Sequence, residues 1–112
     1  MIQAIKLLVY PVRDIEKAHA HYQKILGVEP YVAAPYYVGF KVGEVEIGLT
    51  PHGHPGQTGP ICYWQVADIK KSLETFVAAG SSVDQAVKDV GGGRLIASAK
   101  DADGNVTWLL QP

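Results

Sequence analysis

The chain has 112 residues, with 10 basic and 11 acidic side chains and a formal net charge of -1. This length suits one compact domain, and 47% apolar with 19% charged residues is an ordinary globular composition. The near-neutral charge offers no electrostatic basis for binding nucleic acid, so no nucleic-acid partner is expected. Neither a bilayer-spanning apolar run nor a signal-peptide pattern occurs, which predicts a cytoplasmic protein without a membrane partner.

Two helices are expected from the apolar spacing and from the residues that bracket it. Asp14 is a good N-cap for a first helix that begins at Ile15, and Gly27 is a natural stop after Leu26. Asp68 begins a second helix in the same way, and Gly80 ends it. Because the two caps and the two stops are almost equally spaced along the chain, we expect an internal duplication.

Short β-rich runs precede and follow each helix. Strands are predicted at residues 5–10, 28–33, 36–42, 45–50, 61–66, 81–89, 94–100 and 106–111. The resulting order is βαβββ, a Gly/Pro-rich linker at 51–60, and a second βαβββ, which predicts one α+β domain over 1–112 with halves at 1–50 and 61–112. A sheet with a single helix leaves its second face uncovered, so that face needs the other half, a partner chain or a ligand.

The doubled pattern resembles the vicinal-oxygen-chelate superfamily, which includes glyoxalase I, bleomycin-resistance proteins and extradiol dioxygenases. The resemblance covers essentially the whole chain and lies in the order of its motifs, which are Val12-Arg13-Asp14, Leu26-Gly27-Val28, Val66-Ala67-Asp68 and Asp101-Ala102-Asp103-Gly104-Asn105. The segments around Tyr63-Trp64 and Gly91–Gly93 look most like the small glyoxalase-like proteins. The resemblance implies that the two repeats form an open curled sheet with a cup between them, and that two chains pair as a homodimer.

In the metal enzymes of this superfamily, two inward strand positions in each half carry the metal ligands. The resemblance places these positions at Leu7, Gly48, Ile61 and Trp108, none of which has a side-chain donor for a divalent ion. A slip of one residue along any of these strands does not restore a set of ligands. No metal cofactor is therefore expected, and glyoxalase or dioxygenase chemistry loses the ion on which it depends.

Other residues capable of metal or nucleophilic chemistry have ordinary structural explanations. His52 and His54 lie in the linker without a nearby carboxylate, and two ligands do not complete a zinc site. His19 and His21 point to different faces of the first helix, so they cannot share an ion. Cys62 lies in an apolar strand and is expected to be a buried, inert thiol.

Two loops that resemble ligand-binding motifs are likewise expected to be turns. The Asp101 segment lacks the glycine and the glutamate of a calcium-binding EF-hand at their required positions. The Gly91-Gly92-Gly93 run precedes a strand rather than a helix, which removes half of a phosphate-binding loop.

Aromatic side chains remain the most informative feature. Because side chains alternate along a strand, Tyr63 shares a face with Ile61 and Gln65, and Trp108 is expected to line the same cup. The predicted ligand-binding residues are Leu7, Tyr37, Gly48, Ile61, Tyr63, Gln65 and Trp108. The alternative is that the rings simply fill the cup as hydrophobic core.

These observations favour a metal-free protein that binds a small apolar or aromatic molecule in the cup, with the bleomycin-resistance proteins as one form of such binding. Catalysis is not specifically indicated, and no catalytic residue is assigned. A metal-dependent lyase or dioxygenase of the same superfamily is one alternative. A structural or regulatory dimer without a pocket is another.

Overall fold

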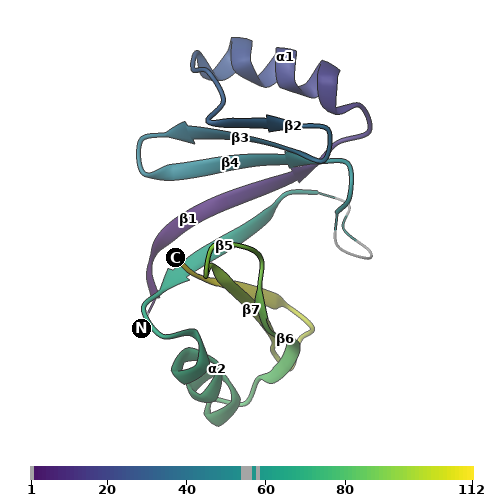
Figure 1. Ribbon diagram of the computed structural model, residues 1–112. Coiled ribbons are helices and arrows are strands. Elements are labelled where there is room, and N and C mark those ends of the chain that lie inside the picture. The colour runs from purple at the N-terminus through teal and green to yellow at the C-terminus, as the bar shows by residue number, and fades with distance from the viewer. Residues whose placement is uncertain (1, 54–56, 58) are drawn as a thin grey trace. The chain divides into compact units, whose positions relative to one another are not determined.

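The computed structural model describes residues 2–53, 57 and 59–112, and its helices and strands follow two successive βαβββ repeats (Figure 1). The first repeat consists of β1 (Ile2–Pro11), α1 (Ile15–Leu26), β2 (Val32–Ala34), β3 (Tyr37–Val42) and β4 (Val45–Thr50). The second consists of β5 (Ile61–Val66), α2 (Ile69–Ala78), β6 (Ser82–Asp89), β7 (Leu95–Lys100) and β8 (Val106–Gln111). The predicted α+β class and the repeated element order are confirmed. Within the described ranges, no helix is long and apolar enough to cross a membrane.

The chain forms two compact units, which share strand β1. The α1 unit comprises Leu7–Ile61, and its strands are hydrogen-bonded in the order β2-β3-β4-β1. The α2 unit comprises Cys62–Pro112 with the first residues of β1, and its strands follow the order β5-β8-β7-β6. In each unit the first and last strands of the repeat are parallel neighbours, β1 with β4 and β5 with β8, while the other pairs are antiparallel.

Helix α1 covers one face of its sheet because alternate strand residues on that face are apolar. Phe40 and Leu49 are fully buried there, with Tyr22 and Leu26 of the helix packed against the same cluster. The helix begins where the Asp14 side chain accepts a hydrogen bond from the Lys17 backbone N–H, at 3.1 Å. It ends at Gly27, whose φ of 72° is the left-handed conformation that favours glycine. The predicted bounds of this helix are confirmed.

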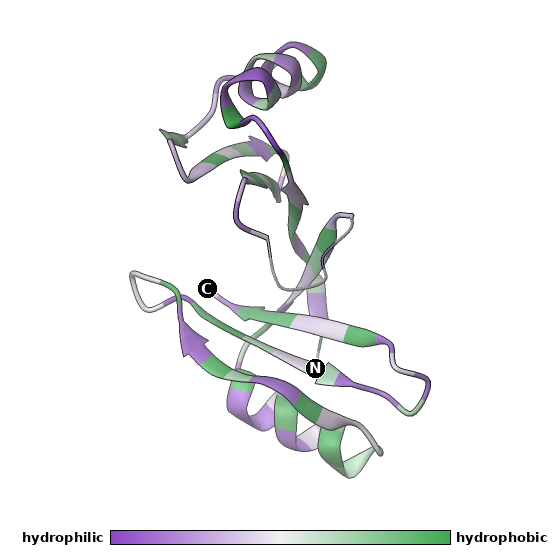
Figure 2. Ribbon diagram, turned by 90° about the vertical axis from the view of Figure 1, so that its right-hand side faces the viewer, coloured by the Kyte–Doolittle hydropathy of each residue, from purple (hydrophilic) through white to green (hydrophobic). Residues whose placement is uncertain are grey.

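Helix α2 covers the corresponding face of the second sheet. Ile69 and Leu73 pack against a buried cluster that includes Val66, Ala97 and Leu109. In Figure 2, apolar and polar residues alternate along the strands of each unit. This alternation gathers the apolar side chains on the face that the helix covers. Asp68 caps this helix as Asp14 caps α1, with a 3.1 Å hydrogen bond from the Lys71 N–H.

Five predicted strands have different bounds in the structure: β3, β6 and β7 each begin one residue later than predicted, and β1 and β2 differ by more. β1 begins at Ile2, earlier than predicted, and β2 begins only at Val32 instead of residue 28. Glu29-Pro30 delays β2 because proline has no N–H to donate to a sheet. Val28 instead packs against the α1-side core, and the Tyr31 N–H makes a 2.8 Å hydrogen bond to the Gly39 carbonyl before regular pairing begins.

Both loops that the sequence assigns to turns are turns. Gly91, Gly92 and Gly93 all have positive φ, between 62° and 116°, and connect β6 to β7. The Asp101 carboxylate accepts hydrogen bonds from the backbone N–H groups of Asp103 and Asn105, each at 2.9 Å. These bonds, led by the one from Asn105, lower the pKa of Asp101. The side chain therefore closes the turn between β7 and β8.

An irregularity in β6 depends on one buried hydroxyl. The pairing of β6 with β7 shifts register on both sides of Gln85, as in a β-bulge. Fully buried Ser98 on β7 accepts a 3.0 Å hydrogen bond from the Gln85 N–H and donates one of 3.0 Å to the Asp84 carboxylate. Ser98 thus satisfies a backbone donor at the shifted position.

Replacing Ser98 by alanine is expected to lower the free energy of unfolding by about 1–3 kcal/mol, because the Gln85 N–H and the Asp84 carboxylate both lose a partner. Urea unfolding followed by circular dichroism measures this loss. Ser82→Ala, at an exposed β6 position, is the matched control and is expected to change stability by less than about 0.5 kcal/mol. Equal effects of the two substitutions would contradict the role assigned to Ser98.

Candidate functional site

The face of the α1 unit opposite α1 brings together three of the predicted site residues. Leu8 and Tyr10 of β1 pack on the α1 side, so Leu7 and Val9 point to the other face. On β4, Glu46 pairs with Leu7 and Gly48 pairs with Val9 in parallel register. Tyr37 reaches the same face from β3, since its ring contacts Gly48. Leu7, Tyr37 and Gly48 therefore share one face of the sheet.

Two glycines on this face make room for two tyrosine rings. A Cβ added to Gly39 would lie only 2.5 Å from the Tyr31 ring, and one added to Gly48 would collide with the Tyr37 hydroxyl. Gly39 and Gly48 are register partners on adjacent strands, so the space is continuous across β3 and β4. The absent Cβ atoms thus form a shallow recess in the sheet, into which the two phenols pack.

A buried carboxylate, Glu46, lies on the same face. Its side chain is only 6% exposed, and it accepts a 2.8 Å hydrogen bond from the Tyr31 hydroxyl. Glu46 is absent from the predicted site residues, because only Gly48 and its immediate neighbours in sequence were candidates for a ligand on β4. Strand periodicity could have identified it, since Val45, Ile47 and Leu49 face α1 and Glu46 must then share the face of Gly48.

The environment of Tyr31 keeps its phenol neutral. Burial of the phenol raises the pKa of Tyr31 well above its ordinary value, and the hydrogen bond to Glu46 raises it further. The ammonium of Lys41 lies 5.8 Å from the centre of the Tyr31 ring, within range of a cation–π interaction. Tyr31 therefore acts as a hydrogen-bond donor to Glu46 while its ring covers Gly39.

The face of the α2 unit opposite α2 carries an aromatic pair. Trp64 and Leu109 pack on the α2 side, which turns Tyr63 and Trp108 to the other face. Tyr63 and Trp108 are register partners in the parallel β5–β8 pair, and their ring centres lie 5.5 Å apart at an angle of 53°. This tilted geometry is a favourable one for aromatic rings.

Gln65 and Ile61, the two other predicted site residues on β5, follow the alternation that places Tyr63. The side-chain N–H₂ of Gln65 donates a 2.9 Å hydrogen bond to the side-chain oxygen of Gln3 on β1. Ile61 is the first residue of β5 and is partly buried. The structure therefore fixes the amide of Gln65 rather than leaving it as a loose polar group.

The four positions at which the resemblance expects metal ligands carry no side-chain donor atoms for a divalent ion. Leu7, Gly48, Ile61 and Trp108 offer no coordinating nitrogen, oxygen or sulfur on a side chain of the kind that holds such ions. Glu46 adds one carboxylate to this face, but it is already hydrogen-bonded to Tyr31. Across residues 2–53, 57 and 59–112, no three His, Cys, Asp or Glu side chains are grouped so that they could hold a metal.

The contacts of His19 and Cys62 are those of ordinary structural residues. His19 is partly buried at the edge of the core, where it contacts the Phe40 ring edge-on and hydrogen-bonds to Gln23 at 2.9 Å. Cys62 is expected to be a buried thiol, and in the structure it is only partly buried. Burial nevertheless raises the pKa of the Cys62 thiol, which disfavours the reactive thiolate. His54 lies outside the described residues.

Comparison with known proteins settles the family. The model of the Glyoxalase/Bleomycin resistance protein/Dioxygenase superfamily matches residues 4–109. The chain belongs to this superfamily. A search of curated proteins found no match to this glyoxalase-superfamily chain.

Solved structures of other proteins share its fold. A member from Vibrio splendidus 12B01 is 17% identical, with a TM-score of 0.67 and coverage of 99% of this chain and 98% of the other. Methylmalonyl-CoA epimerase from Mycobacterium tuberculosis is 14% identical, with a TM-score of 0.72 and coverage of 99% and 89%. A hypothetical protein from Bacillus halodurans C-125 is 12% identical, with a TM-score of 0.80 and coverage of 96% and 93%. At these identities the similarity establishes the fold alone.

Gly48→Ala is expected to lower the free energy of unfolding by about 1–3 kcal/mol, because the new methyl group displaces the Tyr37 ring. The loss is expected to shrink when the same substitution is made in a Tyr37→Ala background, where the obstructing hydroxyl is gone. Thermal or urea unfolding of the single and double variants measures this coupling. Gly59→Ala serves as control, since a Cβ at Gly59 meets open space. Additive losses in the double variant would rule out the steric explanation.

Alkaline pH is expected to destabilise the protein through Tyr31. The folded state holds Tyr31 neutral, whereas an unfolded tyrosine ionises near pH 10, so this contribution to stability is complete below about pH 10 and declines above it. Urea unfolding at about pH 8 and about pH 10.5 measures the decline. Tyr31→Phe is expected to lose less stability between these two pH values than the wild type. Tyr36→Phe, which alters a tyrosine that is 67% exposed, is expected to behave like the wild type.

Proposed function

We propose that this glyoxalase-superfamily chain binds a small apolar or aromatic molecule without the aid of a metal ion. The observation that carries the proposal is the pairing of Trp108 with Tyr63. Trp108 occupies a position at which the resemblance expects a metal ligand, and there it contributes an aromatic surface instead of a donor atom. The proposed ligand packs on Trp108, which is only partly buried, while Tyr63, which is 4% exposed, supports the indole ring from the same face of the α2 unit.

Aromatic side chains suit such a ligand for physical reasons. Their rings offer a large apolar area with little flexibility, and offset or tilted contacts between rings add about 0.5–1.5 kcal/mol to the gain from burial. Ser98 is the register partner of Trp108 on β7, so a small side chain lies beside the indole. Gln65, which shares the face of Tyr63 on β5, supplies a polar neighbour. A flat, largely apolar compound with one hydrogen-bonding group matches this set.

The proposal also includes the face of the α1 unit opposite α1. Leu7 and Gly48 supply apolar surface there, and Tyr37 supplies a ring with a polar tip. The Tyr31–Glu46 hydrogen bond keeps the buried charge of Glu46 partnered, which lowers the cost of having a carboxylate on a largely apolar face.

Binding is favoured over the superfamily's metal-dependent reactions because the expected ligand positions carry no donor atoms for a metal ion. Those reactions use the ion to polarise an oxygen of the substrate or to bind dioxygen, and the ion needs several ligands. The four positions in question supply none, and Glu46 is a single carboxylate. An epimerase is among the proteins of similar fold, so a metal-dependent lyase, isomerase or dioxygenase remains the alternative to be tested. We further propose a cytoplasmic homodimer as the form in which the protein works.

The proposal predicts that Trp108 reports ligand binding. In a Trp64→Phe variant, Trp108 is the sole tryptophan, and its emission is expected to change saturably as 2-naphthol or 4-nitrobenzyl alcohol is added. Calorimetric titration of the wild type measures the affinity independently of fluorescence. Tyr63→Ala is expected to weaken binding about threefold to tenfold, since one ring of the pair is lost.

Trp64→Phe is the matched control in the titration, because Trp64 packs against the α2-side core and is expected to leave the affinity unchanged. Elemental analysis of the purified protein is run in parallel, with a substoichiometric metal content expected. Stoichiometric zinc, nickel, manganese or iron would favour the metal-dependent alternative. Absence of saturable binding across a broad panel of aromatic compounds would favour a structural or regulatory dimer.

A further inference from the structure

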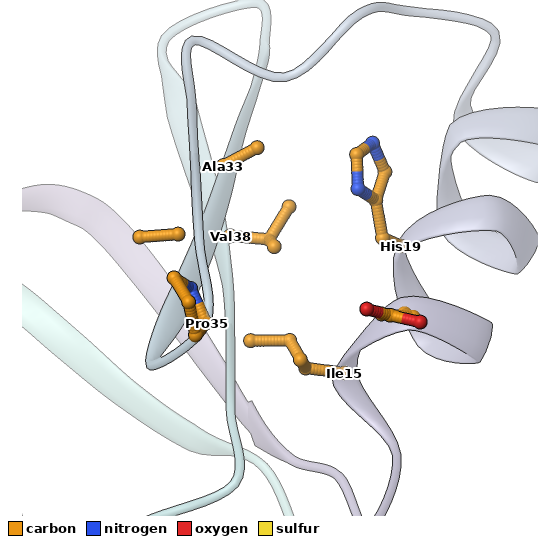
Figure 3. Close-up of a pocket in the computed structure, with 7 residues that line it drawn as sticks. Ile15, His19, Ala33, Pro35 and Val38 are labelled. Atoms are coloured by element: carbon orange, nitrogen blue, oxygen red, sulfur yellow. The ribbon is translucent and has the colours of Figure 1, made fainter.

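A cavity of about 230 Å³ lies between α1 and the β2–β3 hairpin, on the opposite side of the α1-unit sheet from Leu7, Tyr37 and Gly48. In Figure 3, Ile15 and His19 extend from the helix, and Ala33, Pro35 and Val38 face them from the hairpin. Ile15 and Val38 also belong to the core packed under α1, so the apolar floor of the cavity is continuous with that core.

The helix beside the cavity is less deeply buried than the helix of the second repeat. All residues of α1 are described, and none of them is fully buried, whereas α2 buries Ile69, Ser72 and Leu73. Small residues line the strand side of the cavity. Ala33 on β2 is the register partner of Val38 on β3, and Ala34 and Pro35 come next along the chain. These short side chains do not reach the helix, and the space remains open.

The polar groups of the lining come from one side only. Glu16 and His19 lie on α1, and the remaining lining residues are Ile15, Ala33, Ala34, Pro35 and Val38. The His19 ring is held in place by the hydrogen bond to Gln23 and by its edge-on contact with Phe40. Glu16 is therefore the one acidic side chain among the residues that line the cavity, and its charge is negative.

We propose that this cavity binds a small organic ammonium ion. The apolar body of the ligand would pack on Ile15, Ala33 and Val38, beside the fixed His19 ring, while its ammonium group pairs with the Glu16 carboxylate. The volume is below the roughly 300–1,000 Å³ of pockets for drug-sized ligands, which limits the ligand to one ring or a short branched chain. This site is independent of the aromatic pair at Tyr63 and Trp108.

Calorimetric titration with 2-phenylethylammonium tests the proposal on the full chain. The ammonium compound is expected to bind more tightly than 2-phenylethanol, which has the same ring and chain length without the charge. Glu16→Gln is expected to weaken binding of the ammonium compound about threefold to fivefold, the range of a partly exposed ion pair, and to leave 2-phenylethanol unaffected. Glu74→Gln, which removes a carboxylate from α2, is the matched control and is expected to change neither affinity.

Ala33→Leu places a larger side chain in the cavity and is expected to weaken binding of both compounds. Because Ala33 is exposed and lies on an edge strand, this variant is expected to fold, which circular dichroism verifies. The variant is also expected to bind 2-naphthol as the wild type does, so that failure of this proposal can be told apart from failure of the proposed function. Equal affinity of the wild type for both compounds, or unchanged affinity in Ala33→Leu, would overturn the proposal.

Discussion

The alternation of side chains along the strands is the constraint on which the rest of this structure depends. In each unit, one helix seals one face of a sheet, and the core on that face takes every second strand residue. The intervening residues are thereby freed from packing under the helix. On β4 this division is sharp, since Ile47 and Leu49 face α1 while Glu46 and Gly48 face away. Each residue that the proposed function uses lies in the second set.

The two faces opposite the helices differ in chemistry although they derive from the same repeat. The α1 unit combines glycines with tyrosines, so that phenol rings occupy the space left by absent Cβ atoms. It also keeps a carboxylate buried, at a cost that the Tyr31 hydroxyl offsets. The α2 unit combines Tyr63 with Trp108 and carries the buried hydroxyl of Ser98 beside them. Divergence between the repeats has therefore altered the side chains while the element order has stayed the same.

The same divergence affects the helices. Both begin at an aspartate cap with the same hydrogen bond of 3.1 Å. They end differently, since α1 stops at a left-handed glycine and α2 at Ala79 in a right-handed conformation. Only α2 has buried residues, and a cavity lies beside His19 of α1. A duplicated fold thus offers two unlike helix–sheet interfaces.

Much of the fold could be predicted because it depends on local sequence. The caps at Asp14 and Asp68, the turn glycines and the alternation in 45–50 are read within a few residues of each other. Periodicity also predicted that Ile61, Tyr63 and Gln65 share a face, whereas the position of Trp108 was implied by the resemblance to the superfamily. The start of β2 was misjudged, since the β-rich composition of 28–33 outweighed the proline at its centre.

The sequence by itself determined the superfamily, the repeated element order and which residues share a face, because periodicity and capping are local properties. Only the tertiary structure decided that Tyr31 reaches Glu46 across 15 residues, that Ser98 serves a shifted strand, and that α1 and the β2–β3 hairpin line one cavity. These features depend on the lengths and directions of side chains from separate elements. Their meeting is set by packing in three dimensions, which no spacing within one segment encodes.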